Sequence, residues 1–149
     1  MKVLVLNCGS SSIKYKLFEM TTKEVLAQGG IEKIGLPGSF LKLTLPSGEK
    51  KIIEKDVPEH TTGVQFIFDT LTNAEYGAVK DLHEIKAVGH RVLHGGTKFS
   101  GSVLIDDAVI AAVEECCDLG PLHNPANLKG IYAVQKLMPE VPQIAVFDT

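Results

Sequence analysis

The sequence predicts an α/β domain built on a mixed β-sheet, and two patterns lead to this prediction. Short apolar runs joined by polar turns come first, which is typical of β-hairpins. From about residue 61 onward, stretches with helical periodicity alternate with short apolar strands, which is typical of a sheet with helices packed on it. The chain has 149 residues, of which 44% are hydrophobic and 22% charged. This size and composition suit one globular domain.

The first part of the chain predicts strands connected as hairpins. A polar cluster, Asn7–Ser12, separates the first two apolar runs and predicts a turn between antiparallel strands. A second turn, Pro46–Glu49, separates a later pair of strands. The predicted strands are, in order, Val3–Leu6, Ile13–Phe18, Val25–Ile34, Phe40–Leu45 and Lys51–Glu54.

The second part of the chain changes to helical periodicity. Apolar residues recur at helical spacing from Val64 to Leu71, which predicts an amphipathic helix that starts near Thr61 or Thr62. Asn124 followed by Pro125 predicts the start of another helix, with asparagine as the N-cap. The remaining predicted elements are a helix capped by Asp106 or Asp107 that reaches Cys117 and is ended by Gly120-Pro121, the extent of the last helix to Leu137, and the strands Ile85–Val88, Val103–Ile105 and Ile144–Phe147.

Charge and cysteine content exclude several classes of protein. The net charge is −3, from 15 Lys+Arg against 18 Asp+Glu, so the basic surface of a nucleic-acid-binding protein is not expected. The first apolar run is too short for a signal peptide, and no run approaches a transmembrane helix. The odd cysteine count, Cys8, Cys116 and Cys117, argues against a disulfide scaffold. We therefore expect a cytoplasmic protein with no nucleic-acid or membrane partner, in which the adjacent cysteines are small buried hydrophobes rather than a metal or redox site.

Four motifs carry possible chemistry, and the first is the turn Asn7–Ser12. Gly9 permits a close backbone approach, and three successive serines offer hydroxyls and amides to phosphate oxygens. Lys14 adds a positive charge close by. The turn is not a Walker P-loop, because the spacing of its glycine and lysine differs and because a strand rather than a helix follows. A phosphate-binding hairpin and a plain polar turn are both compatible with these residues.

The other three motifs place polar groups at the ends of predicted strands or helices. Arg91, which follows the strand Ile85–Val88, could bind a carboxylate or phosphate bidentately. His123 precedes the helix that starts at Asn124, where a helix N-terminus attracts anions. Asp148 follows the last strand and could bind Mg²⁺ or orient a nucleophile. Taken singly, each of these residues is also compatible with an ordinary surface role.

Taken together, the motifs resemble those of the acetate kinases, in the acetate and sugar kinase/heat-shock 70/actin superfamily. The resemblance spans residues 1–149 and rests on four motifs in the family's order. They are Val3–Lys14, Gly89–Gly96, Gly120–Pro125 and Phe147–Thr149. It implies a ribonuclease H-like (actin-like ATPase) fold, and it implies ATP-dependent phosphorylation of acetate to acetyl phosphate. Propionate or butyrate kinases of the same family, and a non-catalytic nucleotide-gated module of the superfamily, are the alternatives.

The resemblance also implies roles for individual residues. Arg91, His123 and Asp148 would be catalytic, with Arg91 on the substrate carboxylate and His123 on the transferring phosphoryl group. Asn7 would help to bind Mg²⁺ or Mn²⁺. The implied phosphate contacts of ATP are Ser10, Ser12, Lys14 and His123, and the implied acyl pocket is lined by Arg91, Leu93 and Leu122. Leu93 stands where the family usually has valine, and we expect this larger residue to disfavour longer acids.

We further expect residues 1–149 to be the N-terminal domain of a longer enzyme. The resemblance implies that a second domain supplies the adenosine pocket and more catalytic groups. These 149 residues alone would then be inactive and bind ATP weakly. The resemblance also implies a homodimer and a role in acetyl-CoA biosynthesis for the full-length enzyme.

Overall fold

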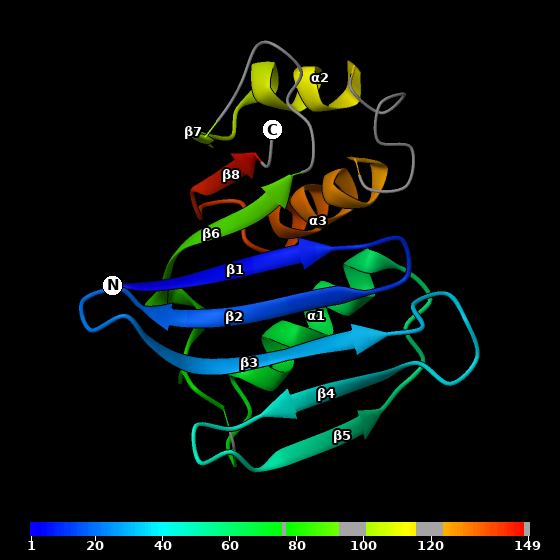
Figure 1. Cartoon of the computed structure of the whole chain (residues 1–149), viewed down its shortest axis with the longest axis vertical. Helices are drawn as coiled ribbons and strands as arrows, with labels where there is room; N and C mark the ends of the chain where they lie inside the picture. The colour runs from blue at the N-terminus through cyan, green and yellow to red at the C-terminus, as the bar shows by residue number, and fades with distance from the viewer. Residues whose placement is uncertain (76, 93–100, 116–123, 148–149) are drawn as a thin grey trace.

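An eight-stranded mixed sheet forms the centre of the computed structural model, which describes residues 1–75, 77–92, 101–115 and 124–147. The strand order is β5-β4-β3-β2-β1-β6-β8-β7, and Figure 1 shows the strands running from β5 at the bottom to β7 at the top. The predicted α/β class with a mixed sheet is therefore confirmed. The strands are β1 (Lys2–Cys8), β2 (Ile13–Glu19), β3 (Glu24–Glu32), β4 (Phe40–Thr44), β5 (Lys50–Glu54), β6 (Ile85–Val92), β7 (Gly101–Leu104) and β8 (Gln143–Phe147).

The first five strands pair in chain order, each antiparallel to the one before it. The predicted hairpins are thus confirmed, and the turn Asn7–Ser12 connects β1 to β2, with Cys8 opposite Ile13. Side chains of β2 alternate between buried and exposed from Ile13 to Leu17, as the sequence pattern predicts for a strand with one covered face.

The last three strands complete the sheet on the other side of β1. β6 runs parallel to β1, and β8 runs parallel to β6, whereas β7 is antiparallel to β8. β6 is longer than the predicted strand Ile85–Val88, because it continues to pair on both sides. Leu6 of β1 lies opposite His90, and Phe147 of β8 lies opposite Val92. His90 and Arg91 consequently belong to the strand, and the prediction that Arg91 follows it was wrong.

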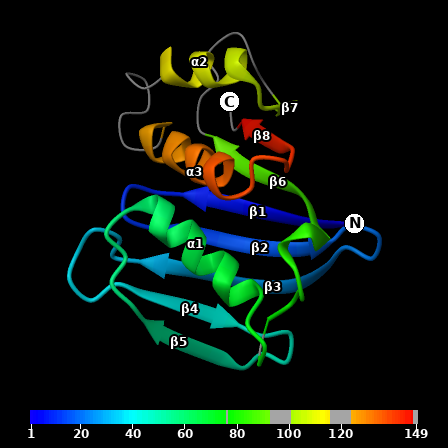
Figure 2. The ribbon, with the colours of Figure 1, turned by 180° about the vertical axis from the view of Figure 1, so that it is seen from behind.

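Helices cover one face of the sheet and leave most of the other face open. α1 (His60–Leu71) and α3 (Asn124–Leu137) lie side by side behind the sheet, as Figure 2 shows. α2 (Asp107–Glu115) packs on α3 near β7. A 3₁₀ helix, η1 (Leu82–Glu84), leads into β6 and was not predicted.

The helix boundaries differ from the predicted ones by one or two residues. α1 begins at His60 with Glu59 as its N-cap, rather than near Thr61 or Thr62. Asn124 is the first residue of α3 rather than its N-cap. The cap expected for α2 is confirmed, because the Asp106 carboxylate accepts a hydrogen bond from the amide of Val109 at 2.9 Å. The predicted end of that helix at Cys117 and Gly120-Pro121 lies outside the described residues.

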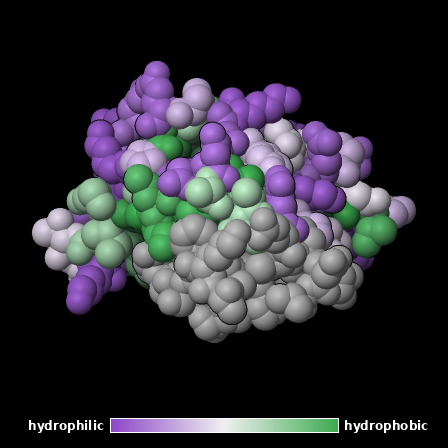
Figure 3. All heavy atoms as spheres, turned by 90° about the horizontal axis from the view of Figure 1, so that it is seen from above, coloured by the Kyte–Doolittle hydropathy of each residue, from purple (hydrophilic) through white to green (hydrophobic). Residues whose placement is uncertain are grey.

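Buried apolar side chains form two clusters of unequal size. The large cluster lies between β1–β5 and the helices behind them, and the small cluster lies near β8 and α2. Seen from above, hydrophobic side chains reach the surface among hydrophilic ones beside the grey residues (Figure 3). The buried members of the small cluster are Val92, Val109, Val113, Leu128 and Ala145. In the described residues, no helix is long and apolar enough to cross a membrane.

Candidate phosphate and carboxylate site

The turn Asn7–Ser12 is held in place by hydrogen bonds to its carbonyl groups. The side-chain amide of Asn127 donates to the Cys8 carbonyl at 3.0 Å, and the ring nitrogen Nε2 of His60 lies 2.7 Å from the Gly9 carbonyl oxygen. The Ile34 amide donates to the Ser11 carbonyl at 2.9 Å. These donors come from α3, from α1 and from the chain just after β3, so three elements that follow the turn in the sequence fix its shape.

The turn closes on itself through the amide of Gly9, which donates to the Ser12 carbonyl at 2.8 Å. A Cβ at Gly9 would lie 2.8 Å from the Ser12 hydroxyl oxygen, so glycine fits this tight turn best. In contrast, no acceptor in the described part of the chain takes the amides of Ser10, Ser11 or Ser12. A turn whose carbonyls are occupied and whose amides are available presents donors to an anion.

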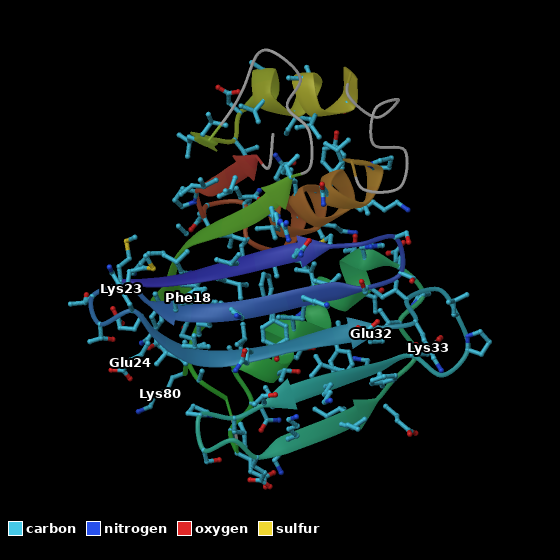
Figure 4. All side chains as sticks on the ribbon, in the orientation of Figure 1. Phe18, Lys23, Glu24, Glu32, Lys33 and Lys80 are labelled. Carbon is cyan, nitrogen blue, oxygen red and sulfur yellow. The ribbon has the colours of Figure 1, made fainter. Side chains whose placement is uncertain are left out.

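Three of the predicted site residues share one groove on the open face of the sheet. Asn7 and Lys14 lie directly opposite each other on β1 and β2. Both line a groove of about 810 Å³, and Arg91 of β6 lines it too. Figure 4 labels Phe18 and Glu32, which also line the groove and lie toward opposite ends of this face. An amide, an ammonium and a guanidinium therefore face the same space, although they come from two distant stretches of the chain.

Ser10 belongs to a second hollow. This hollow has a volume of about 390 Å³ and lies at the start of α1, where His60, Lys129 and Tyr132 also line it. Ser12 lines neither space. The predicted phosphate contacts thus divide between the turn itself and the open face beside it.

The remaining predicted site residues belong to segments that the structure does not describe. His123, Asp148, Leu93 and Leu122 lie outside the described residues, as do Cys116 and Cys117. Their expected roles stay predictions.

His90 and Arg91 are neighbours on β6, and the structure separates their roles. Arg91 is exposed toward the groove, whereas His90 is buried and its Nε2 lies 2.6 Å from the Gln143 side-chain oxygen on β8. Burial lowers the pKa of His90 to about 4, although the bond to Gln143 opposes this shift. A neutral ring that connects β6 to β8 has a structural role.

Two further groups near the turn are perturbed by burial. Burial lowers the pKa of His60, its bond to Gly9 opposes the shift, and the positive charge of Lys129 adds to the lowering. Burial also raises the pKa of the Cys8 thiol to about 12. The free cysteine at the end of β1 is thus an inert packing residue rather than a nucleophile.

The described residues do not form a complete metal site. They contain no group of three histidine, cysteine or acidic side chains that could hold a metal ion. The Asn7 amide oxygen is a ligand type that Mg²⁺ accepts, and Mg²⁺ often takes the rest of its shell from phosphates and water. Asn7 therefore fits an ion that arrives with a phosphate ligand.

Sequence reasoning missed His60 and Asn127, the two side chains that anchor the turn. They lie 51 and 119 positions from their partners, and neither stands in a motif that signals its contact. Only the packing of α1 and α3 against the end of β1 brings them there.

Comparison with known proteins gives a consistent result along the whole chain. The acetokinase family model matches residues 2–149. The chain is 71% identical to an acetate kinase of Phocaeicola vulgatus and 70% identical to one of Bacteroides thetaiotaomicron. In both cases the match covers 100% of this chain and 37% of the relative. The chain thus spans little more than a third of the length of these curated relatives.

Solved structures agree with the sequence relatives. The crystal structure of Porphyromonas gingivalis acetate kinase matches with a TM-score of 0.97 at 65% identity, covering 99% of this chain and 37% of that one. A propionate kinase from Francisella tularensis matches with a TM-score of 0.89 at 37% identity, covering 99% of this chain and 36% of that one. The predicted actin-like ATPase fold is confirmed by these neighbours.

Proposed function

Because the chain belongs to the acetokinase family, we propose that it forms part of an acetate kinase, which transfers the γ-phosphoryl group of ATP reversibly to acetate. The products would be acetyl phosphate and ADP. The observation that carries this proposal is the groove in which Asn7, Lys14 and Arg91 meet beside an anchored turn with available amides. High identity to acetate kinases along all 149 residues supports acetate as the substrate.

The main physical problem of this reaction is charge repulsion. The acetate carboxylate and the γ-phosphate are both anions, so bringing them together is unfavourable unless positive groups surround them. Arg91 would hold the carboxylate through its guanidinium, and Lys14 would face the phosphates. Because a carboxylate attacks without first losing a proton, the chain has to supply orientation and charge stabilisation rather than a strong base.

The other proposed roles follow the family resemblance. Ser10 and Ser12 would donate to phosphate oxygens, and His123 would stabilise the transferring phosphoryl group. Asp148 would orient the acetate or the metal. Asn7 would hold the Mg²⁺ or Mn²⁺ bound to ATP, and the ion supplies further neutralisation of phosphate charge when bound.

We propose that these residues form only one part of the enzyme. The relatives are almost three times as long, and we propose that their additional length corresponds to a second domain that binds the adenosine part of ATP. We also propose that the full-length enzyme is a cytoplasmic homodimer that contributes to acetyl-CoA biosynthesis, as the resemblance implies.

The test is to trap acyl phosphate as the hydroxamate with the natural full-length protein, ATP and Mg²⁺. Arg91→Ala should lower kcat/KM for acetate about 100-fold or more, because it removes a charged group from the transition state. Lys86→Ala is the matched control, since Lys86 is an exposed basic residue at the other end of the same strand. Full activity of Arg91→Ala, or ATP turnover that does not depend on a carboxylic acid, would overturn the proposal.

The same assay separates acetate from longer acids. Acetate, propionate and butyrate are compared at equal concentration, and acetate should give the highest kcat/KM. A preference for propionate would instead assign the protein to the activity named for the Francisella tularensis neighbour.

A further inference from the structure

His60 is a buried side chain far in the sequence from any predicted site residue, yet it contacts the turn Asn7–Ser12. It is the first residue of α1 and is only 4% exposed. Its Nε2 lies 2.7 Å from the Gly9 carbonyl oxygen, a short distance for such a bond. The helix therefore contributes a side chain directly to the turn that precedes it by about fifty residues.

The chemistry of the two partners fixes the direction of this bond. A carbonyl oxygen can only accept a hydrogen bond, so Nε2 must carry the proton and donate it. The neutral ring can do so in one tautomer, and burial keeps the ring neutral by lowering its pKa. No charge on His60 is needed for the contact.

This bond determines where the next amide points. The peptide bond between Gly9 and Ser10 is planar and trans, so its C=O and N–H groups point in opposite directions. When His60 holds the carbonyl on the side of α1, the Ser10 amide is directed away from the ring. The bond from the Ile34 amide to the Ser11 carbonyl fixes the Ser12 amide in the same way.

Without His60, the Gly9–Ser10 peptide could rotate. Gly9 is the residue of the turn with the most conformational freedom, so rotation there meets the least steric resistance. A rotated peptide would present a carbonyl oxygen where an amide had been. The partial negative charge of that oxygen would repel a phosphate instead of binding it.

We infer that His60 is a positioning residue for nucleotide phosphates: its Nε2–H holds the Gly9 carbonyl and thereby aims the Ser10 amide. This inference rests on the proposed function, because it assigns the turn to ATP rather than to acetate. It predicts that loss of the Nε2–H donor weakens ATP binding and leaves acetate binding nearly unchanged, since Arg91, the proposed acetate ligand, lies on the open face of the sheet.

The test uses two variants whose side chains end in the same amide group but differ in length. In His60→Gln the side-chain amide nitrogen can occupy the place of Nε2, whereas in His60→Asn it can reach only the place of Nδ1. Because asparagine is smaller than histidine and glutamine, loss of packing alone would lower the stability of His60→Asn and weaken both ligands, whereas loss of the Nε2–H donor should weaken Mg-ATP binding only. His83→Asn is the control, because His83 is an exposed histidine that bonds Asp81 beside η1.

Two quantities are measured on the natural full-length protein. The first is the dissociation constant of Mg-ATP by titration calorimetry, and the second is the KM of acetate in the hydroxamate assay. His60→Asn should raise the dissociation constant about five- to tenfold, as expected for one lost hydrogen bond, and His60→Gln should stay within about twofold of the wild type. Neither variant should change the KM of acetate more than about twofold. Circular dichroism at the assay temperature checks that both variants are folded.

Each outcome decides between the two proposals. If the wild type binds Mg-ATP but forms no acyl phosphate, the proposed function fails while the calorimetric comparison still tests His60. Equal ATP affinity of the asparagine and glutamine variants would overturn the role of His60, and so would an equal loss in both. If His60→Asn does not fold, failure of His60→Gln to retain wild-type ATP affinity overturns the role on its own. A wild type that does not bind Mg-ATP overturns both proposals.

Discussion

The large and the small hydrophobic cluster support different parts of the candidate site. The large cluster is built mainly from consecutive hairpins and α1, whose partners are close together along the chain. The small cluster combines residues of β6, β8, α2 and α3, which are distant in sequence. The turn Asn7–Ser12 rests on the large cluster through β1 and β2, whereas Arg91 lies on β6 next to Val92 of the small cluster.

The turn and Arg91 are therefore held in place by different parts of the structure. The turn Asn7–Ser12 rests on a packed core, and three hydrogen bonds to its carbonyls fix its shape. Arg91 instead lies on a strand, and its side chain is exposed on the open face of the sheet. Under the proposed function, the turn would offer pre-positioned donors to the phosphate and Arg91 would hold the carboxylate from a separate element.

The largest expected effect comes from the core of the large cluster. Phe68 of α1 is 1% exposed, and Phe68→Ala should lower the free energy of unfolding by about 3–5 kcal/mol because it leaves a cavity that the surrounding strands cannot close. Urea unfolding followed by circular dichroism measures this change.

A matched pair of valines compares the clusters directly. Val64 of α1 and Val113 of α2 are both helical and both 0% exposed, one in each cluster. Val64→Ala should cost more stability than Val113→Ala, because the smaller cluster has fewer neighbours to keep a cavity open. An equal loss in the two variants would show that the clusters are packed alike.

The next effect is a dependence of stability on pH that comes from His90. Its pKa is about 4 in the folded protein, against about 6.5 for an ordinary histidine, so the unfolded chain binds the proton more readily between these values. Stability should therefore rise as pH rises from about 4 to about 6.5, and the contribution of His90 over this range is about 3 kcal/mol.

The measurement is the urea midpoint between pH 4 and pH 7 for the wild type and His90→Gln. The difference between the two curves isolates His90, because His60 and the carboxyl groups titrate in both proteins. A ring pKa near 6.5 for His90, measured by NMR, would contradict the prediction.

The sequence predicted the hairpins and helices well because their signals are local. Alternation along β2 and the polar turn before it need only a few neighbouring residues to be recognised. The length of β6 could not be predicted in the same way. Its last residues, up to Val92, join the strand because β1 and β8 offer partners on both sides, and that pairing is not written in the segment itself.

In the candidate site, too, residues in local motifs were predicted and residues placed by tertiary packing were not. Asn7, Lys14 and Arg91 were predicted from their motifs, and the structure brings them to one groove. His60 and Asn127 were not predicted, because a histidine at the start of a helix and an asparagine within one carry no signal of a distant partner. Anchors of a turn depend on how helices dock onto strand ends, which is a tertiary property.

The smallest expected effect tests the contact between α3 and the end of β1, where the two clusters meet. A Cβ at Gly130 of α3 would lie 2.5 Å from the sulfur of Cys8 and 3.5 Å from its Cβ. Gly130→Ala should therefore cost about 1–3 kcal/mol of stability through overpacking, although alanine is the better helix former. Urea unfolding measures the change.

A second substitution shows whether the sulfur is the cause. Cys8→Ala removes the atom that the new methyl group would meet, so Gly130→Ala should cost much less in the Cys8→Ala background. Gly63→Ala is the control within the large cluster. Its Cβ would lie 2.9 Å from Cδ1 of Ile13, the end of a flexible side chain that can move aside. If Gly130→Ala costs as much with alanine at position 8 as with cysteine, then contacts other than the one with the buried thiol limit how closely α3 can approach β1.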